Sequence, residues 1–471
     1  MAIEISKGKA LSVFSLTMIN VIAIDSIRNL PINAKYGLSI GFFYLMGTLL
    51  FLIPTALVTA ELATHRPQTG GTYIWVRDAF GPRWGFVNIW LQWIYNVVWY
   101  PTILSFIAAS IAYLINPALT TNKIYMISMI IGTFMIATLV NSFGIKTSAK
   151  ISTLGALLGT LLPMTLMILL SICWILQGKP LAAPFDTVHL FPHLSEVHNV
   201  AFFVVILFSL MGLEMSAVHA GDVKNPKRDY PRALLYSSLL IVISLIFSSI
   251  AIAIVLPTNT INIISGVNAA FATFLQTNHL SWLLPIAVLM IILGGFCGMA
   301  AWVIGPTRGL MVAAQDGCLP PSLARINQKG APIAILILQW IVVCLLCLLF
   351  LFFNTVNAAY WILSDLTAQL ALVYYITFFA AALRLRYKTP LIKNAYRIPG
   401  GKIGIWIVCG VGILTCVSAI IAGFLIPTDI VDLSQYTLYE WVLSLGMVVF
   451  IVLPLIIYAL SDRESVFSGE K

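Results

Sequence analysis

The residues that could do chemistry are ionisable side chains inside long apolar runs. Asp25 and Arg28 lie in the first run, Glu214 follows Gly212 in the sixth, and Asp365 lies in the tenth. A charged group within a membrane span is costly, so it marks a substrate, ion or proton site by default. The structural alternative for Glu214 is a kinked helix whose carboxyl group hydrogen-bonds to a neighbouring helix.

Small and polar residues accompany these charges. Gly212 and Ser209 precede the glutamate, and a serine separates Asp25 from Arg28. A glycine at mid-membrane favours a helix that breaks and frees backbone groups for a ligand. On an intact helix, the i to i+3 spacing of Asp25 and Arg28 would instead let the two side chains pair locally. Both interpretations are open for the first run.

The elements that must position these residues are membrane helices. Of 471 residues, 60% are hydrophobic and only 9% are charged, which lies far outside the range of soluble globular proteins. Twelve apolar runs reach the roughly 20 residues that a helix needs to cross a bilayer. The predicted spans are 11–34, 39–62, 85–116, 124–143, 151–176, 200–221, 233–257, 282–305, 333–353, 358–383, 403–426 and 438–460. We therefore predict an all-α polytopic membrane protein.

The basic residues predict the orientation of these spans. With a cytoplasmic N-terminus, all but four of the 26 lysines and arginines fall in cytoplasmic segments; the exceptions are Lys35, Lys123, Lys179 and Arg28. This asymmetry predicts that both termini are cytoplasmic. The net charge of +9 is thus a topology signal and indicates no nucleic-acid partner.

The spans are organised as a repeat. The first and sixth each carry an interruption with a carboxylate, and each begins a block of five spans, so the second block must be inverted. We predict a first repeat over 1–199, an inverted repeat over 200–386, and two accessory spans with a C-terminal tail over 387–471. Interrupted segments in corresponding positions place a transport site at the midplane.

Two further features of the sequence involve aromatic residues. Trp302 follows three glycines in the eighth span, and it is either a pocket wall or a packing residue. The loop after the second span contains Tyr73, Trp75 and Trp84 between glycine breaks. These aromatics predict a short helix that lies on the cytoplasmic face of the membrane.

Three segments resemble the amino acid–polyamine–organocation (APC) transporter superfamily: GLE followed by HAGDVKNPKRDYPRAL, AELATHRPQTGGTYIWVRDAFGPRWGF, and RGLMVAAQDGCLPPSLARINQKGAP. The segment FLIPTALVTAELAT and the loop after it are most similar to the bacterial glutamate/GABA antiporter family. The resemblance covers nearly the whole chain and is specific to the superfamily, not to a substrate. It implies the five-plus-five fold of the bacterial leucine transporter, with helices 1 and 6 broken and two accessory helices. It also implies a location in the bacterial cytoplasmic (inner) membrane.

The resemblance also implies a site. In the superfamily, backbone amides of the broken first span hold the substrate's α-carboxylate, and carbonyls of the broken sixth span hold its α-amino group. The matching substrate-binding candidates are Ile24, Asp25, Ser26, Ile27, Phe208, Ser209, Leu210, Gly212 and Trp302. The coupling and gating candidates are Glu214, Phe208, Trp302, Arg28 and Asp365.

Asp25 departs from the superfamily's usual Gly-Ser-Gly and would repel a carboxylate. Three roles are open for it: binding the substrate's amino group, pairing with Arg28, or carrying a proton. Arg28 and Asp365 lie at similar depths below the outer ends of their spans, so we predict that they form an extracellular gate pair. Glu214 is the candidate for proton coupling, because burial disfavours the charged form of a carboxyl group.

These observations predict a secondary active amino-acid transporter, either an antiporter or a proton-coupled permease, working by alternating access. The partners expected are a small-molecule substrate, protons and the lipid bilayer, for a monomer or homodimer. An amine, polyamine or other metabolite permease on the same fold, sodium coupling, and a non-transporting sensor are the alternatives. No nucleotide-binding motif or catalytic constellation is recognisable, so we expect neither an enzyme nor a cofactor or metal.

Overall fold

The computed structural model describes residues 11–66, 70–142, 152–183, 190–192, 197–223, 225–328, 330–388, 395–425 and 433–461. The two ends of the chain, 1–10 and 462–471, which were predicted to be cytoplasmic, lie outside these ranges. Within the described part the chain is helical and contains no named strand. The predicted all-α class is therefore confirmed.

The described helices follow one another along the whole chain. The α-helices are α1 (Val13–Ile24), α2 (Leu30–Ala34), α3 (Ile40–Gly47), α4 (Ile53–His65), α5 (Gly71–Phe80), α6 (Pro82–Ile115), α7 (Lys123–Ser142), α9 (Leu162–Leu176), α10 (Val197–Ser209), α11 (Pro226–Val255), α12 (Gly266–Thr277), α13 (Leu284–Gln315), α14 (Ile333–Cys347), α15 (Leu349–Phe352), α16 (Val356–Lys388), α17 (Gly401–Ala422) and α18 (Leu433–Leu460). Short 3-10 helices η1 (Ile27–Asn29) and η7 (Leu213–Asp222) follow α1 and α10. Two π-helical segments, η3 (Thr48–Leu52) and η5 (Gly155–Leu161), precede α4 and α9.

Twelve helical segments of the described chain are long and apolar enough to cross a membrane, as the sequence predicts. Several extend beyond their predicted ends. The seventh starts at Pro226 instead of 233, the eighth continues to Gln315, and the tenth to Lys388. Each of these predicted spans is bounded by the first charged residues, where the apolar run ends, whereas the backbone hydrogen bonds of the helix continue into the polar region. Pro226, in the first turn, suits a helix start because its missing N–H would be unpaired there.

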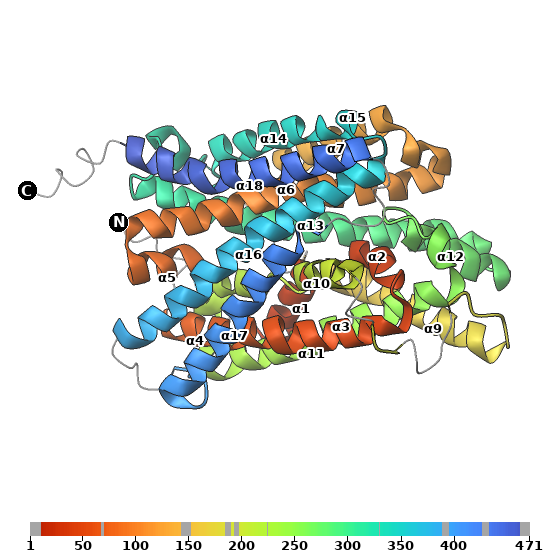
Figure 1. Ribbon diagram of the computed structural model, residues 1–471, viewed down its shortest axis with the longest axis horizontal. Helices are drawn as coiled ribbons and strands as arrows, with labels where there is room; N and C mark the ends of the chain where they lie inside the picture. The colour runs from red at the N-terminus through yellow and green to blue at the C-terminus, as the bar shows by residue number, and fades with distance from the viewer. Residues whose placement is uncertain are drawn as a thin grey trace, which may run out of the picture.

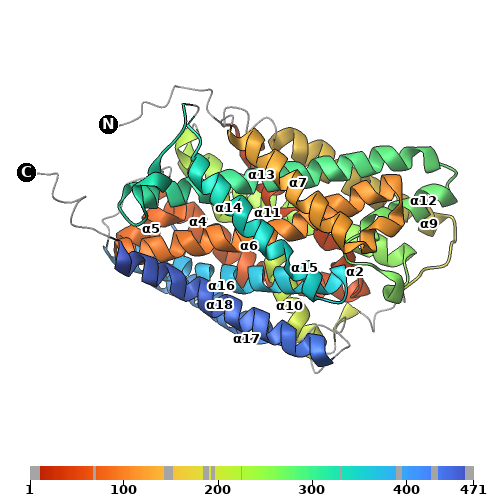
Figure 2. The same ribbon diagram turned by 90° about the horizontal axis from the view of Figure 1, so that it is seen from above.

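The bundle has two ends, which we name by their elements. At the α5 face, on the left of Figure 1, lie α5 and the C-terminal ends of α4 and α16. At the opposite face, on the right, lies α12, beside the C-terminal end of α11. Helices α17 and α18 both pack on α16 and lie along one flank of the bundle (Figure 2).

Two short helices, α5 and α12, differ from what the sequence predicts. The predicted helix after the second span is present as α5, but it packs against α6 and α16 and buries Tyr73 and Trp75 instead of presenting them to the membrane surface. Trp84, at the start of α6, is the exposed aromatic of the three. Helix α12 lies between the predicted seventh and eighth spans, in a segment for which no element was predicted, and its asparagine and threonines keep its hydropathy low. It nevertheless buries Phe271 and Phe274 against the bundle.

Candidate functional site

The first membrane helix is interrupted where Asp25 was expected to break it. Helix α1 ends at Ile24. Asp25 and Ser26 are not helical, and the chain becomes helical again in η1 and α2. The carboxyl group of Asp25 turns away from the chain to α11, where Oδ2 accepts a hydrogen bond of 2.6 Å from the Ser244 hydroxyl. This hydrogen bond ties the first interruption to α11.

The sixth membrane helix is interrupted at Gly212. Helix α10 ends at Ser209, and Gly212 has φ 125°, a conformation that side chains rarely adopt. A Cβ atom there would also lie 2.7 Å from the Trp302 ring. Both the backbone conformation and the close ring therefore favour glycine at this position. The Gly212 N–H donates to the Tyr375 hydroxyl at 2.8 Å, and that hydroxyl donates to Oε2 of Glu214 at 2.6 Å. Tyr375 therefore holds the interruption and the carboxylate together.

Trp302 joins the two interruptions. Its Nε1 donates to the Ala23 carbonyl at 2.7 Å, next to the end of α1, while its ring lies against Gly212. The ring centroids of Tyr95 and Trp99, both on α6, lie 6.2 Å away. The sequence left Trp302 open as a packing residue or a pocket wall. These contacts are packing contacts, and they place Trp302 between α1 and the interruption after α10.

A small pocket of about 20 Å³ lies beside the first interruption. Asp25, Ser26, Ile27 and Arg28 line one side of it, and glycines of α13 line the other. A buried water needs about 10–15 Å³ of such volume, so the pocket has room for about one water. In this conformation the predicted binding residues around the first interruption are packed together.

A second cavity, of about 400 Å³, opens at the opposite face; we call it the deep cavity. Its rim carries the exposed Thr258 and Asn259, and its lining includes the buried Arg28 and the half-buried Phe208. This volume lies in the range of small-molecule sites. Arg28 lines both spaces, so it stands at the boundary between the deep cavity and the small pocket.

The guanidinium group of Arg28 is held by neutral partners. Its side chain is only 3% exposed, and Nη1 donates to the hydroxyls of Thr102 and Tyr360, both at 2.9 Å. The guanidinium carbon lies 5.3 Å from the ring centroid of Phe208, 6.0 Å from that of Trp99 and 5.6 Å from that of Tyr360. These are cation–π contacts with aromatic rings from three different helices.

Neither of the ion pairs considered for Arg28 is formed. Among the described residues, it makes no salt bridge with Asp25, Glu214 or Asp365. Asp365 lines the same deep cavity but accepts a hydrogen bond of 2.8 Å from Tyr439 of α18. The local pairing of Asp25 with Arg28 fails because the break at Asp25 removes the helical i to i+3 geometry. In this conformation the expected gate pair is open.

The remaining predicted residues lie around these contacts. Ile24 and Leu210 are buried, and the Ser209 hydroxyl lies 3.0 Å from that of Tyr44 and donates to the Ile206 carbonyl. The buried Asp25 Oδ1 and Glu214 Oε1 have no hydrogen-bond partner within the described chain. Each carboxylate therefore keeps one oxygen available for a proton or a cation.

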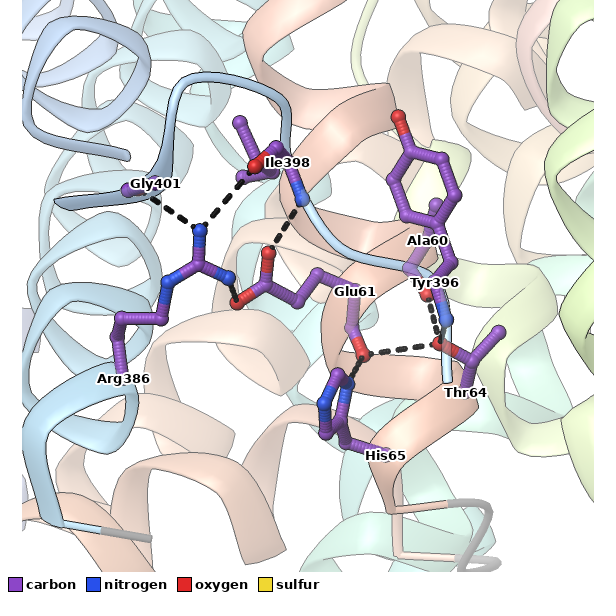
Figure 3. Close-up of polar contacts among 8 residues, drawn as sticks. All are labelled: Ala60, Glu61, Thr64, His65, Arg386, Tyr396, Ile398 and Gly401. Atoms are coloured by element: carbon purple, nitrogen blue, oxygen red, sulfur yellow. Dashed lines mark hydrogen bonds and ion pairs between the residues drawn. The ribbon is translucent and has the colours of Figure 1, made fainter. Parts of the chain in front are cut away.

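Sequence reasoning missed a buried ion pair at the α5 face. Nη1 of Arg386, on α16, lies 2.6 Å from Oε1 of Glu61, on α4, and both side chains are nearly inaccessible, at 3% and 8%. The irregular segment 395–400, before α17, passes beside them (Figure 3). The Ile398 N–H donates to Glu61 Oε2 at 2.7 Å, and Arg386 Nη2 donates to the carbonyls of Ile398 and Gly401. We call this cluster the Glu61 latch.

A second set of ion pairs lies beside the latch. Arg77 Nη1 lies 2.7 Å from Asp316 Oδ2, which also accepts a hydrogen bond from Tyr73, and Arg66 pairs with Asp78. Burial and the bond to Asp316 raise the pKa of Tyr73 above its ordinary value, so its hydroxyl stays a donor at neutral pH. Together with the latch, these pairs tie α4, α5, α13 and α16 to one another.

Comparison with known proteins identifies the family. A model of the amino acid permease family matches residues 11–459. The chain is 48% identical to an uncharacterised transporter of Legionella pneumophila over 97% of this chain and 98% of the relative. It is 31% identical to a glutamate/gamma-aminobutyrate antiporter of Lactococcus lactis, over 97% and 92% of the two chains. A probable agmatine/putrescine antiporter of the same species is 24% identical over 89% and 88%. The chain, a multi-pass membrane transporter and not an enzyme, belongs to the amino acid permease family.

Proposed function

We propose that the protein is a secondary active transporter of amino acids that works by alternating access across the cytoplasmic membrane. The observation that carries this proposal is the deep cavity, which runs from one face down to Arg28 at the first helix interruption. The α5 face is closed by the Glu61 latch and its neighbouring ion pairs. A cavity open to one side only, ending at broken helices, is the arrangement that alternating access requires.

The orientation follows the basic residues. The α5 face is cytoplasmic in this proposal, with both termini on that side, and the deep cavity opens to the exterior. The chain is then an inverted repeat of 1–199 and 200–386 followed by the accessory region 387–471. The support is that α1 and α10 are interrupted at corresponding positions in the two blocks.

Substrate binds, in this proposal, between the two interruptions, against residues 24–27, residues 208–212 and Trp302. The small pocket there is nearly filled, and Phe208 and Arg28 stack between it and the deep cavity. Entry therefore requires Phe208 and Arg28 to separate. Arg28 and Asp365 would approach each other when the deep cavity closes, which is the gating role proposed for them.

Glu214 is the proposed coupling group. It is buried, one oxygen accepts from Tyr375, and the other has no partner within the described chain. Such a carboxyl group can gain and lose a proton with little rearrangement, because Tyr375 keeps its bond in either state. Antiport is supported by the relatives' names, and proton-coupled uptake by this carboxylate.

Transport of an amine or polyamine is the second candidate. A cationic substrate would find partners in the unpaired oxygens of Asp25 and Glu214, and a relative is named as a probable agmatine/putrescine antiporter. Arg28, at the bottom of the entry path, opposes this candidate by repelling cations.

The test is counterflow in proteoliposomes loaded with one amino acid or one amine at a time, at two pH values, with and without sodium. Exchange of a narrow set of amino acids supports an antiporter. Exchange of amines alone moves the assignment to the second candidate, and the absence of flux with every compound rejects transport.

A further inference from the structure

Arg28 is a buried cation without a buried anion. Its Nη1 is occupied by two hydroxyls, while Nε and Nη2 make no hydrogen bond within the described chain, and Nε is fully buried. The carboxylates of Asp25, Glu214 and Asp365 accept hydrogen bonds from the hydroxyls of Ser244, Tyr375 and Tyr439, respectively. One edge of the guanidinium group is therefore unused in the described structure.

Such an arrangement is costly unless something supplies the missing charge. A buried charge that lacks a counter-ion is strongly unfavourable, and aromatic faces compensate for only part of that cost. Guanidinium edges match carboxylates in geometry, because two parallel N–H groups meet two oxygens. Arg28 reaches both the deep cavity and the small pocket, so a ligand that enters through the cavity meets it.

The aromatic residues around Arg28 fix its orientation. Phe208 comes from α10, Trp99 from α6 and Tyr360 from α16, so the planar group is stacked among rings of three different helices. Thr102 and Tyr360 hold the Nη1 corner. A cation that is positioned this rigidly and left unpaired is a site prepared for an anion.

We propose that Arg28 forms an anion subsite that pairs with a carboxylate of the transported molecule through its Nε and Nη2 edge. This inference rests on the proposed transport function and adds to it the chemical class of the ligand. The carboxylate has two sources, the α-carboxylate of any amino acid or an acidic side chain, and the choice of ligands separates them.

The experiment measures binding of four compounds to the purified full-length protein in lipid nanodiscs by isothermal titration calorimetry. L-glutamate carries both carboxylates, L-glutamine only the α-carboxylate, γ-aminobutyrate only the terminal one, and putrescine none. We expect glutamate to bind and putrescine to bind at least about tenfold more weakly, since hydrogen bonds to a charged group contribute a factor of about ten or more. Loss of affinity with glutamine assigns the side-chain carboxylate, and loss with γ-aminobutyrate assigns the α-carboxylate.

The Arg28→Gln variant tests the residue. Its affinity for glutamate should fall by about tenfold to a hundredfold, while its affinity for putrescine stays the same or rises. Arg28→Lys keeps the charge but loses the two-pronged edge, so we expect an intermediate loss; it also serves if the glutamine variant does not fold. Lys179→Gln removes a cation that stacks on Trp174, away from the deep cavity, and should bind like the wild type.

Three results overturn the anion subsite. The first is binding of putrescine as tight as that of the carboxylates, and the second is no binding of any carboxylate. The third is an equal loss for all ligands in Arg28→Gln, which would indicate a gate or structural role instead. Counterflow with the same compounds separates this proposal from the transport proposal: glutamate flux with an unchanged glutamate affinity in Arg28→Gln rejects only the subsite, whereas glutamate binding without flux rejects only transport.

Discussion

Charged side chains form ion pairs at the α5 face but lack a counter-charge within the described chain around the helix interruptions. At the α5 face, Glu61 pairs with Arg386 and Arg77 pairs with Asp316. Around the helix interruptions, Arg28, Asp25 and Glu214 are as buried as the Glu61–Arg386 pair, but their side chains hydrogen-bond only to hydroxyl groups of the described residues. The first set links helices to one another and closes that face. The second set lacks counter-charges, which is expected of groups whose partners arrive as substrate or protons.

The difference follows from what each set must do. A buried ion pair is expensive to break, because separating it leaves an uncompensated charge. This makes it suited to hold a face shut until enough binding free energy is available. An unpaired buried group changes its charge or partner at lower cost, which suits a site that must bind and release in every cycle.

Breaking the Glu61 latch should have the largest effect. Glu61→Gln leaves Arg386 buried without its anion and should lower the free energy of unfolding by about 3–5 kcal/mol. Thermal unfolding in lipid nanodiscs measures this loss. The double variant Glu61→Leu with Arg386→Met should recover most of it. A single variant as stable as the wild type would contradict the comparison, since the latch would then behave like the unpaired set.

Gly212→Ala should have the next largest effect. The left-handed backbone costs about 1–3 kcal/mol for a side chain, and the new Cβ would press on the Trp302 ring. We expect counterflow to be lost. Gly37→Ala is the matched control, because Gly37 also has a positive φ but nothing within 4 Å of a Cβ. Equal behaviour of the two variants would show that the contact with Trp302 is unimportant.

Glu214→Gln should act on transport more than on stability. The amide oxygen can still accept from Tyr375, so unfolding should change by no more than about 1 kcal/mol. Transport, however, should lose its pH dependence, because the proton site is removed. Initial rates in proteoliposomes between pH 5 and 8 are the measurement, with Asp365→Asn as the comparison variant. A full pH profile in Glu214→Gln would remove the coupling role from this residue.

Arg77→Gln should have the smallest effect on stability. The side chains of Arg77 and Asp316 are 32% and 34% exposed, unlike those of the latch. Pairs at this exposure contribute about 0–1 kcal/mol and are screened by salt. We therefore expect a small shift in unfolding temperature at low ionic strength that vanishes at high ionic strength. A loss as large as that of Glu61→Gln would mean that exposure does not distinguish the two pairs.

Much of the site could be predicted from local sequence. A carboxylate or a glycine inside an apolar run is visible in a short window, and α1 and α10 end next to Asp25 and Gly212. The partners of these groups could not be predicted. Ser244 lies 219 residues after Asp25, and Tyr375 lies 161 residues after Glu214, so no local spacing connects them.

The Glu61 latch illustrates the same limit. Glu61 and Arg386 each lie near the end of an apolar run, where charged residues are common, and 325 residues separate them. Each looks like an ordinary interfacial charge by itself. The burial of α5 and the helix α12 were also missed, because both depend on which surfaces of the bundle cover them.

From the amino-acid sequence we could predict how many times the chain can cross a membrane, which two helices are interrupted, and which charged residues lie within the apolar spans. These properties depend on hydropathy and backbone preference within about one span of residues. The folded structure was needed to show which charges are paired, which have no counter-charge among the described residues, and at which face the deep cavity opens. Charge pairing acts over a few ångströms in space, and helices far apart in the chain supply the two partners.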